Sequence, residues 1–183
     1  RDTNPWIHIP GGYFRTMYNP DITWQYAAGP EPHLGGRQVP WPRGRVLGGS
    51  SAINGLLYVR GQARDYNVWR QLGNVGWSYD DVLPYFKRAE NQERGACDWH
   101  GAGGPLSVTN IRMENPLCSA FVAASIEAGI PATQDFNGES QEGAGNYQCT
   151  IRDGRRGSTA VTYLRDAANR PNLRVITNAE VEG

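Results

Sequence analysis

The chain has 183 residues, and its 18 Lys and Arg balance 18 Asp and Glu, so the formal net charge is zero. This length suits one domain, or one domain and a small piece, and the neutral balance argues against a nucleic-acid partner or an anionic membrane surface. The 23 glycines and 12 prolines exceed the roughly 12% combined share of average proteins, which predicts a loop-rich globular chain.

The first half of the chain is predicted to begin with irregular backbone and then to form helices. Residues 1–45 are rich in proline, glycine and aromatic residues and are expected to form short strands, including "ITWQYAA" at 22–28. A helix is expected from Gly49 to Val59, because this stretch is almost wholly apolar. A second helix is expected over 63–73, where aromatic and apolar residues recur every three positions and Gly73 ends the pattern.

Capping residues mark two further helices. Ser78 is a good N-cap for a helix that runs to about residue 90, with Asp81 three residues on and Pro84 either kinking the helix or lying in its first turns. Asn115, followed by a proline and closed by Gly129, frames the clearest helix of the chain, at 115–128. Between these helices, "GGPLSVTNI" at 103–111 alternates like a strand.

The last part predicts a strand, an Asp-Gly turn, a helix and a final strand. The strand and turn lie in "NYQCTIRDGRRG" at 146–157, the helix at 158–168 begins with Ser158 as its cap, and the final strand is "NLRVITNA" at 172–179. A strand at that place would lack partners for its apolar face. Because the chain also opens without a Met, we expect a fragment of a longer protein.

Three cysteines, Cys97, Cys118 and Cys149, are widely spaced and odd in number, which argues against a disulfide framework. We interpret them as buried thiols in a reducing compartment. Cys97 and His100 have the spacing of half a zinc site, but no second pair follows, so no metal is predicted.

The stretch "GGSSAING" at 48–55 carries the strongest chemical signal. Amides at a helix N-terminus lack partners and carry partial positive charge, glycines allow a ligand to approach the backbone, and serines add hydroxyl donors. Together they predict an anion-binding mouth suited to a phosphate. Asn54, on an apolar helix expected to be buried, needs hydrogen-bond partners, which a heteroaromatic cofactor would supply. The alternative is a glycine turn that caps a core helix, with Asn54 bonded to nearby backbone.

The wider stretch "GRVLGGSSAINGLLYVRGQARDYN" resembles the first signature of the glucose-methanol-choline (GMC) oxidoreductases. The resemblance extends through "TWQY", "GWSYDDVLPYFKRAE" and "STAVTYLRDAANRPNLRVIT", so it covers nearly the whole chain, and bacterial alcohol and choline dehydrogenase-like members are the most similar. The fixed places of the signature are filled by Gly44, Arg45, Gly48, Gly49, Ser50, Ser51, Ile53, Asn54, Tyr58, Gly61 and Asn67.

The resemblance implies an α/β fold with α+β character, part of a GMC-type FAD-binding fold together with part of its substrate-binding domain. Residues 1–110 would belong to the FAD-binding domain, with its FAD lid and signature helix. Residues 111–155 would belong to the substrate domain, and residues 156–183 would return to the FAD-binding domain, with truncation at both ends.

The resemblance also implies the cofactor contacts. The backbone from Gly48 to Ser51 and the Ser50 hydroxyl would lie near the FAD pyrophosphate. Ile53 stands where some relatives carry the histidine that attaches FAD covalently, so FAD is expected to be held non-covalently. The residues implied to contact FAD are Trp24, Val46, Gly48, Gly49, Ser50, Ser51, Asn54, Gly55, Leu56 and Val181.

Several family features have no match in the chain. The family opens with a strand, G-x-G-x-x-G and a helix, then an acidic residue that binds the ribose; the chain has only the near miss "GAGNYQ". The C-terminal catalytic His pair is also not matched by His8, His33 or His100, so the catalytic residues are unknown.

Other candidate residues have structural interpretations. The carboxylates Asp80, Asp81, Glu139 and Glu142 suit helix caps or a solvated face, and "RDGRRG" at 152–157 suits a solvated hairpin tip, with an anion contact as the alternative. Trp69, Trp77 and Trp99 suit packing better than substrate stacking. The Gly-x-Ser-x-Gly spacing of a serine-hydrolase elbow is not met by "GGSSAING".

The function implied by the resemblance is FAD-dependent oxidation of a choline-like or primary alcohol to an aldehyde, by hydride transfer to flavin N5, with a quinone or oxygen as electron acceptor. Two alternatives are a hydroxynitrile lyase of the same fold and an inactive fragment; the fragment alone is expected to lack activity. The implied location is the cytoplasm, or the periphery of the inner membrane. The expected partners are the alcohol substrate and the missing N- and C-terminal parts of the same enzyme.

Overall fold

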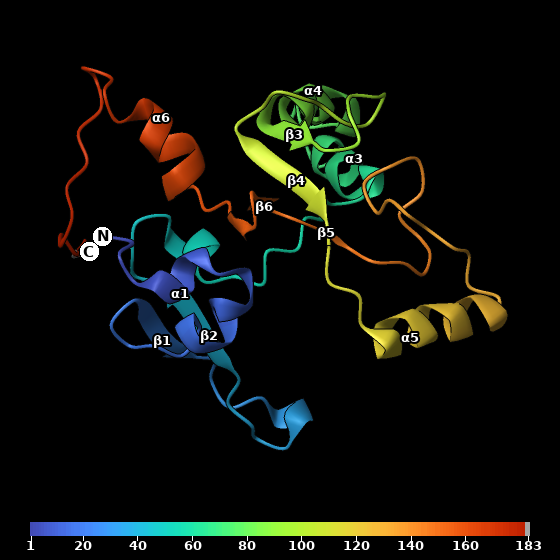
Figure 1. Cartoon of the computed structure of the whole chain (residues 1–183), viewed down its shortest axis with the longest axis horizontal. Helices are drawn as coiled ribbons and strands as arrows, with labels where there is room; N and C mark the ends of the chain where they lie inside the picture. The colour runs from blue at the N-terminus through green and yellow to red at the C-terminus, as the bar shows by residue number, and fades with distance from the viewer. Residues whose placement is uncertain (182–183) are drawn as a thin grey trace. The chain divides into compact units, whose positions relative to one another are not determined.

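The computed structural model describes residues 1–181 and divides into two compact units. Unit 1 comprises Arg1–Leu56 and the chain from Asp153 onward, and unit 2 comprises Leu57–Arg152. Each unit mixes helices and strands (Figure 1), which confirms the predicted α/β class with α+β character. The assignment of 1–110, 111–155 and 156–183 to FAD-binding and substrate domains stays a prediction.

Unit 1 begins with three short helical turns, because prolines and glycines interrupt the backbone there. The side chain of Asn4 caps the first turn by accepting a hydrogen bond from the amide of Trp6 at 3.0 Å. The turns are α1 (Pro5–His8), η1 (Pro10–Gly12) and α2 (Tyr13–Thr16).

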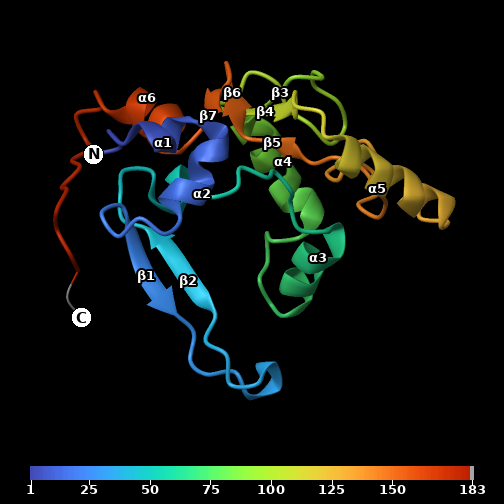
Figure 2. The same ribbon diagram turned by 60° about the horizontal axis from the view of Figure 1, so that its bottom comes forward.

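A two-stranded antiparallel ribbon follows these turns (Figure 2). Strand β1 (Thr23–Ala27) confirms the strand predicted at 22–28, and it pairs with β2 (Pro40–Gly44) from Thr23 opposite Gly44 to Ala27 opposite Pro40. The turn η2 (Pro32–Leu34) lies in the connection. The small core beside the ribbon consists of Ile7, Ile22, Val46, Ala52 and Ile53.

The final part of unit 1 contains β7 (Arg155–Arg156), the π-helical turn η4 (Ala160–Leu164) and α6 (Arg165–Ala167). These turns confirm a helical segment within 158–168. Ser158 does not cap this segment with its side chain, because its buried hydroxyl oxygen accepts no hydrogen bond from a backbone amide. The strand predicted at 172–179 is wrong within the described residues, where this segment pairs with no strand and Ile176 is 66% exposed.

Unit 2 contains the capped helices α3 (Ala63–Gln71) and α4 (Tyr79–Ala89), which confirm the predictions at 63–73 and 78–90. Ser78 and Asp81 form a reciprocal capping box, as expected from the sequence. Hydrogen bonds from Ser78 lower the pKa of the Asp81 carboxyl. Pro84 lies inside α4 rather than in its first turn. The rings of Tyr66 and Phe86 join the two helices, with centroids 5.6 Å apart.

A three-stranded sheet forms the other half of unit 2. It consists of β3 (Glu90–Gln92), β4 (Leu106–Asn110) and β5 (Gln148–Cys149), with β3 parallel to β4 and β5 antiparallel to it. Strand β4 confirms the strand predicted at 103–111. Strand β6 (Ile151–Arg152) packs on β4 before the Asp-Gly turn, where both Asp153 and Gly154 have positive φ.

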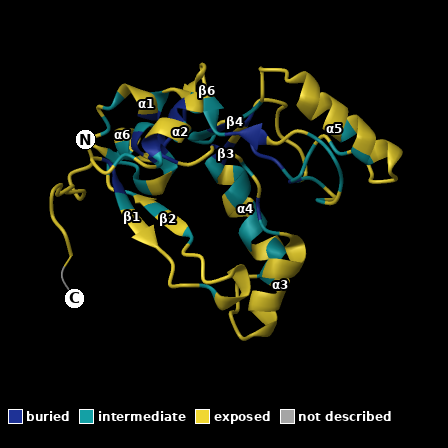
Figure 3. Cartoon of the chain, turned by 90° about the horizontal axis from the view of Figure 1, so that it is seen from below, coloured by how far each residue is buried: buried dark blue, intermediate teal, exposed yellow. Residues whose placement is uncertain are grey.

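Helix α5 (Pro116–Glu127) confirms the helix predicted at 115–128. The Asn115 side chain accepts a hydrogen bond from the amide of Leu117 at 2.9 Å, and Gly129 has a φ of +92° just beyond the last turn. All residues of α5 are exposed or half-buried (Figure 3), including Leu117 at 79% and Phe121 at 74%. No helix among residues 1–181 is long and apolar enough to cross a membrane.

Candidate functional site

The segment after β2 forms a tight turn rather than the expected helix. A single 3₁₀ turn, η3 (Gly49–Ala52), replaces the helix predicted from Gly49 to Val59, which is wrong beyond Ala52. The chain bends away because Leu56 adopts the left-handed region with a φ of +65°, which a helix interior excludes. A four-residue turn carries little of the dipole of a long helix, so the turn lacks the partial positive charge that was expected to favour an anion.

Asn54 directs this bend with its side chain. Its Oδ1 accepts a hydrogen bond from the amide of Leu56 at 3.1 Å, which closes a local turn of the kind that Asn favours. The residue is exposed and not buried as predicted, because the bend carries it off the apolar face that a helix would have had. Ile53 and Leu56 on either side are buried.

The two serines of the motif have different roles. The Ser51 hydroxyl donates to the Gly48 carbonyl at 2.5 Å and accepts from the Thr159 amide at 2.9 Å. The Ser50 hydroxyl accepts from the Gly44 amide at 3.2 Å and is exposed. Ser51 therefore holds the turn to the 158–160 segment, while Ser50 lies at the surface of the turn.

Gly44 and Gly48 permit the close packing of this turn. A Cβ on Gly44 would lie 2.2 Å from the carbonyl carbon of Gly49, and one on Gly48, which has a φ of +90°, would lie 3.3 Å from Ala160. Gly44 and Gly48 are therefore required by the close approach of other parts of the chain itself.

Arg156 is a buried residue beside the turn whose placement the sequence interpretation missed. It was expected at a solvated hairpin tip, but only 2% of its surface is exposed. Its Nη1 donates to the Asn54 carbonyl and to Asn54 Oδ1, both at 2.7 Å, and its Nε donates to the Ile7 carbonyl at 2.8 Å. Burial lowers the pKa of Arg156 to about 10. The signal available in the sequence was strand alternation, which turns Arg155 outward and Arg156 inward.

A cavity of about 580 Å³ lies in the same unit. Trp24 and Val46, both implied to approach FAD, line it together, and the Arg45 guanidinium lies 4.9 Å from the centre of the Trp24 ring. The segment 176–180 forms another wall, and Val181 follows it with 93% of its surface exposed. The turn at 48–56 and this cavity thus place the predicted cofactor residues in unit 1.

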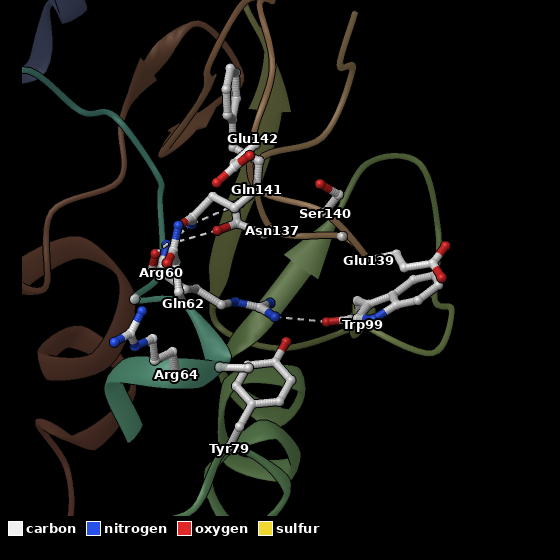
Figure 4. Close-up of a pocket in the computed structure, with 14 residues that line it drawn as sticks. Arg60, Gln62, Arg64, Tyr79, Trp99, Asn137, Glu139, Ser140, Gln141 and Glu142 are labelled. Atoms are coloured by element: carbon white, nitrogen blue, oxygen red, sulfur yellow. Dashed lines mark hydrogen bonds between the residues drawn. The ribbon is translucent and has the colours of Figure 1, made fainter. Parts of the chain in front are cut away.

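A second cavity, of about 320 Å³, lies in unit 2 (Figure 4). Its walls carry the expected solvated carboxylates Glu139 and Glu142, and also Trp99 and Tyr79. Beside it, the Arg60 guanidinium donates to the Trp99 carbonyl at 2.7 Å, as the dashed line in Figure 4 marks.

Trp69 and Trp77, which were expected to pack, contact each other edge to face with ring centres 5.7 Å apart.

The cysteines and His100 do not form a metal site among residues 1–181. All three thiols are free. Cys97 and Cys118 are exposed, which corrects the expectation of buried thiols, and only Cys149 is buried, where burial raises its pKa. His100 instead lies between two carboxylates, Glu90 and Asp135.

Comparison with known proteins identifies the class of this fold. The family described as GMC oxidoreductase matches residues 7–183. Oxygen-dependent choline dehydrogenase of Brucella anthropi is 49% identical over 175 residues, which are 96% of this chain and 32% of that protein. The corresponding protein of Sinorhizobium fredii is 47% identical over the same shares.

Solved structures give the same answer. The crystal structure of pyridoxine 4-oxidase from Mesorbium loti matches with a TM-score of 0.87 and 32% identity, over 96% of this chain and 35% of that one. An FAD-dependent oxidoreductase from Chaetomium thermophilum matches with a TM-score of 0.80 and 26% identity, over 93% and 31%. The chain belongs to the GMC oxidoreductase family, and it spans about a third of the length of these relatives.

Proposed function

We propose that this chain is the part of a GMC flavoenzyme that holds FAD, in an enzyme that oxidises a choline-like or other primary alcohol to an aldehyde. When bound, FAD supplies the hydride acceptor, at N5, for the alcohol carbon. The observation that carries the proposal is the pairing of the GMC turn at 48–56 with a cavity lined by Trp24 and Val46 in the same unit.

The residues present suit a dinucleotide with a negatively charged middle and two flat rings. Arg156 is a buried cation without a carboxylate partner among the described residues, and its Nη2 has no hydrogen-bond acceptor there. Such a charge favours an anion nearby. Trp24 offers an aromatic face in a cavity large enough for a nucleoside, which supports adenine binding there.

We assign different segments of the chain to different parts of FAD. The backbone from Gly48 to Ser51 and the Ser50 hydroxyl would face the pyrophosphate, and Asn54, Gly55 and Leu56 would face the isoalloxazine. Trp24, Val46 and Val181 would hold the adenine end. Ile53 is 4% exposed and aliphatic, and it offers no nucleophile, which supports non-covalent binding.

The substrate and the acceptor are inferred from the relatives. The curated proteins at 47–49% identity are named oxygen-dependent choline dehydrogenases, which supports a choline-like alcohol and oxygen, with a quinone as the other acceptor. The base that takes the hydroxyl proton is not assigned to any residue of this chain. The three free thiols support the cytoplasm as the location, and association with the inner membrane surface is the alternative.

The test uses the full-length enzyme. Acid precipitation should release one FAD per chain into the supernatant, and anaerobic addition of choline should bleach the flavin absorbance, whereas tetramethylammonium, which lacks the hydroxyl, should not. Retention of the flavin on the precipitate would refute non-covalent binding. Failure of every alcohol in a panel to bleach a bound flavin would refute the proposed oxidation.

A further inference from the structure

Arg156 joins three segments of unit 1 that are distant in sequence. Its Nε binds the Ile7 carbonyl of α1, and its Nη1 binds the carbonyls of Ser51, at 3.2 Å, and Asn54, at 2.7 Å. Its own backbone lies in β7. A planar guanidinium with donors in a fixed fork can make these contacts at once, which the single ammonium of a lysine cannot do.

The contacts with Asn54 bear on the conformation of the turn. Asn54 Oδ1 accepts from Arg156 Nη1 at 2.7 Å and from the Leu56 amide at 3.1 Å, so one side-chain oxygen connects the cation to the bend. Leu56 is held there at a φ of +65°, a conformation that a bulky residue keeps only when its surroundings enforce it. Arg156 is part of what enforces it.

The charge of Arg156 has no partner within the described chain. Arg156 takes no part in the ion pairs of Arg60, His100 and Arg112, and the oxygens that it binds, on Ile7, Ser51 and Asn54, are all neutral. With a pKa of about 10 the guanidinium stays protonated near neutral pH. A buried cation that is not neutralised is unfavourable unless something offsets it, and its Nη2 is still available as a donor.

From the sequence, the N-terminus of a long helix was expected to supply positive potential at this motif, but that helix does not form. A buried guanidinium beneath a four-residue turn supplies positive potential in another way, since its charge lies one hydrogen bond from the Ser51 and Asn54 backbone. Field from a fixed charge in a water-excluded site is only weakly screened.

We propose that Arg156 is a positioning residue for the cofactor, which holds the 48–56 turn in its binding conformation through Asn54 and supplies the positive charge that favours the FAD pyrophosphate. This inference rests on the proposed function. It predicts two separable effects, because the geometry needs the guanidinium fork whereas the potential needs only a cation.

The experiment compares Arg156→Met and Arg156→Lys with Arg155→Met and Arg155→Lys in the deflavinated full-length enzyme. The dissociation constants of FAD and of ADP, a probe for the diphosphate, are measured by titration, and the visible spectrum of bound FAD is recorded. Arg155 is the matched control, because it is the adjacent residue on the same strand and is exposed.

We expect R156M to weaken the binding of both FAD and ADP at least tenfold, which corresponds to about 1.4 kcal/mol, because it removes both the fork that holds the turn and the positive charge. R156K should bind ADP within threefold of the parent, but it should bind FAD at least threefold more weakly and with a shifted flavin spectrum. Both Arg155 variants should match the parent in all three measurements.

Parent-like FAD and ADP binding by R156M would overturn the inference while the proposed function stands. If R156M does not fold, as judged by circular dichroism, R156K decides: parent-like FAD affinity and spectrum in R156K would overturn the positioning role. A parent enzyme that binds no FAD would remove the proposed function itself, and the inference with it.

Discussion

Arg60 Nη2 lies 2.6 Å from Glu90 Oε2, and both side chains are almost fully buried. Arg60 also donates to the Trp99 carbonyl, so this pair connects β3 with two loops of unit 2. Removing one partner of a buried ion pair leaves the other charge uncompensated, which typically destabilises by about 3–5 kcal/mol. We expect Arg60→Met to lower the free energy of unfolding by this amount, measured with urea.

The matched control is the exposed pair of Arg112 and Glu93, whose side chains approach equally closely, at 2.6 Å. Arg112 is 80% exposed on its side chain, and exposed pairs contribute about 0–1 kcal/mol. Arg112→Met should therefore change the free energy of unfolding by less than about 1 kcal/mol. Equal losses in the two variants would refute the assignment of the Arg60 pair as the stabilising one.

His100 makes the stability of unit 2 depend on pH. Its Nδ1 lies 2.9 Å from Glu90 Oε1 and its Nε2 lies 2.7 Å from Asp135 Oδ2. The hydrogen bond with Glu90, and then that with Asp135, raise the pKa of His100 above 6.5 against the opposing effect of burial. Its stabilising contribution is then complete below pH 6.5 and is lost as pH rises through the raised pKa.

We expect the free energy of unfolding to fall between pH 6 and pH 9 in the parent, and to fall less in His100→Gln, which cannot carry the charge. The exposed His33 provides the control, since His33→Gln should keep the parental pH dependence. A parental slope in His100→Gln would assign the pH effect to another group.

Gly44 is predicted to tolerate no side chain. A Cβ there would lie 2.2 Å from the backbone of Gly49, so Gly44→Ala must displace the turn at 48–56. Overpacking of this kind costs about 1–3 kcal/mol, and FAD binding should weaken as well. Gly29→Ala is the control, because a Cβ at Gly29 would meet nothing within 4 Å; a loss of stability in that variant as large as in Gly44→Ala would remove the steric explanation.

Asn137 should not tolerate replacement of its side-chain amide, because the amide both accepts and donates a hydrogen bond. Its Oδ1 accepts from the Arg60 amide at 2.7 Å and its Nδ2 donates to the Tyr58 carbonyl at 3.0 Å, with 6% of the residue exposed. Asn137→Asp replaces that donor by an oxygen that faces a carbonyl, so a loss of about 1–3 kcal/mol is expected in thermal or urea unfolding.

Asn115→Asp serves as its control. Asn115 is a helix cap at which Asp functions about as well as Asn. Its unfolding should match that of the parent, and comparable losses at the two positions would show that the amide of Asn137 has no special role.

The parts of the fold that the sequence predicted are those with local determinants. The helices at 63–71, 79–89 and 116–127 have caps written in neighbouring residues, such as Ser78 with Asp81 and Asn115 before Pro116. Their boundaries depend on hydrogen bonds within a few positions, so spacing and residue type were sufficient.

The parts that failed depend on contacts that spacing cannot reveal. The apolar run after Gly49 suits a helix, but the Asn54 side chain and the left-handed Leu56 end it after one turn. The cluster of buried Glu90 and His100 with half-buried Asp135 joins residues up to 45 positions apart. For the candidate site, the motif located the turn, while the contacts of Arg156 with Ile7, Ser51 and Asn54 depend on tertiary packing that spacing does not reveal.

The reach of Arg156 along the chain sets an order of events in biosynthesis. Its hydrogen bonds to Ile7, Ser51 and Asn54 span 149, 105 and 102 residues. Translation proceeds from the N-terminus at about 5–20 residues per second, so the turn at 48–56 emerges from the ribosome many seconds before the side chain that secures it. Unit 2 lies wholly within that interval, at Leu57–Arg152. We therefore expect the turn at 48–56 to lack its contacts with Arg156 until unit 2 has been synthesised, so that flavin binding follows the synthesis of unit 2.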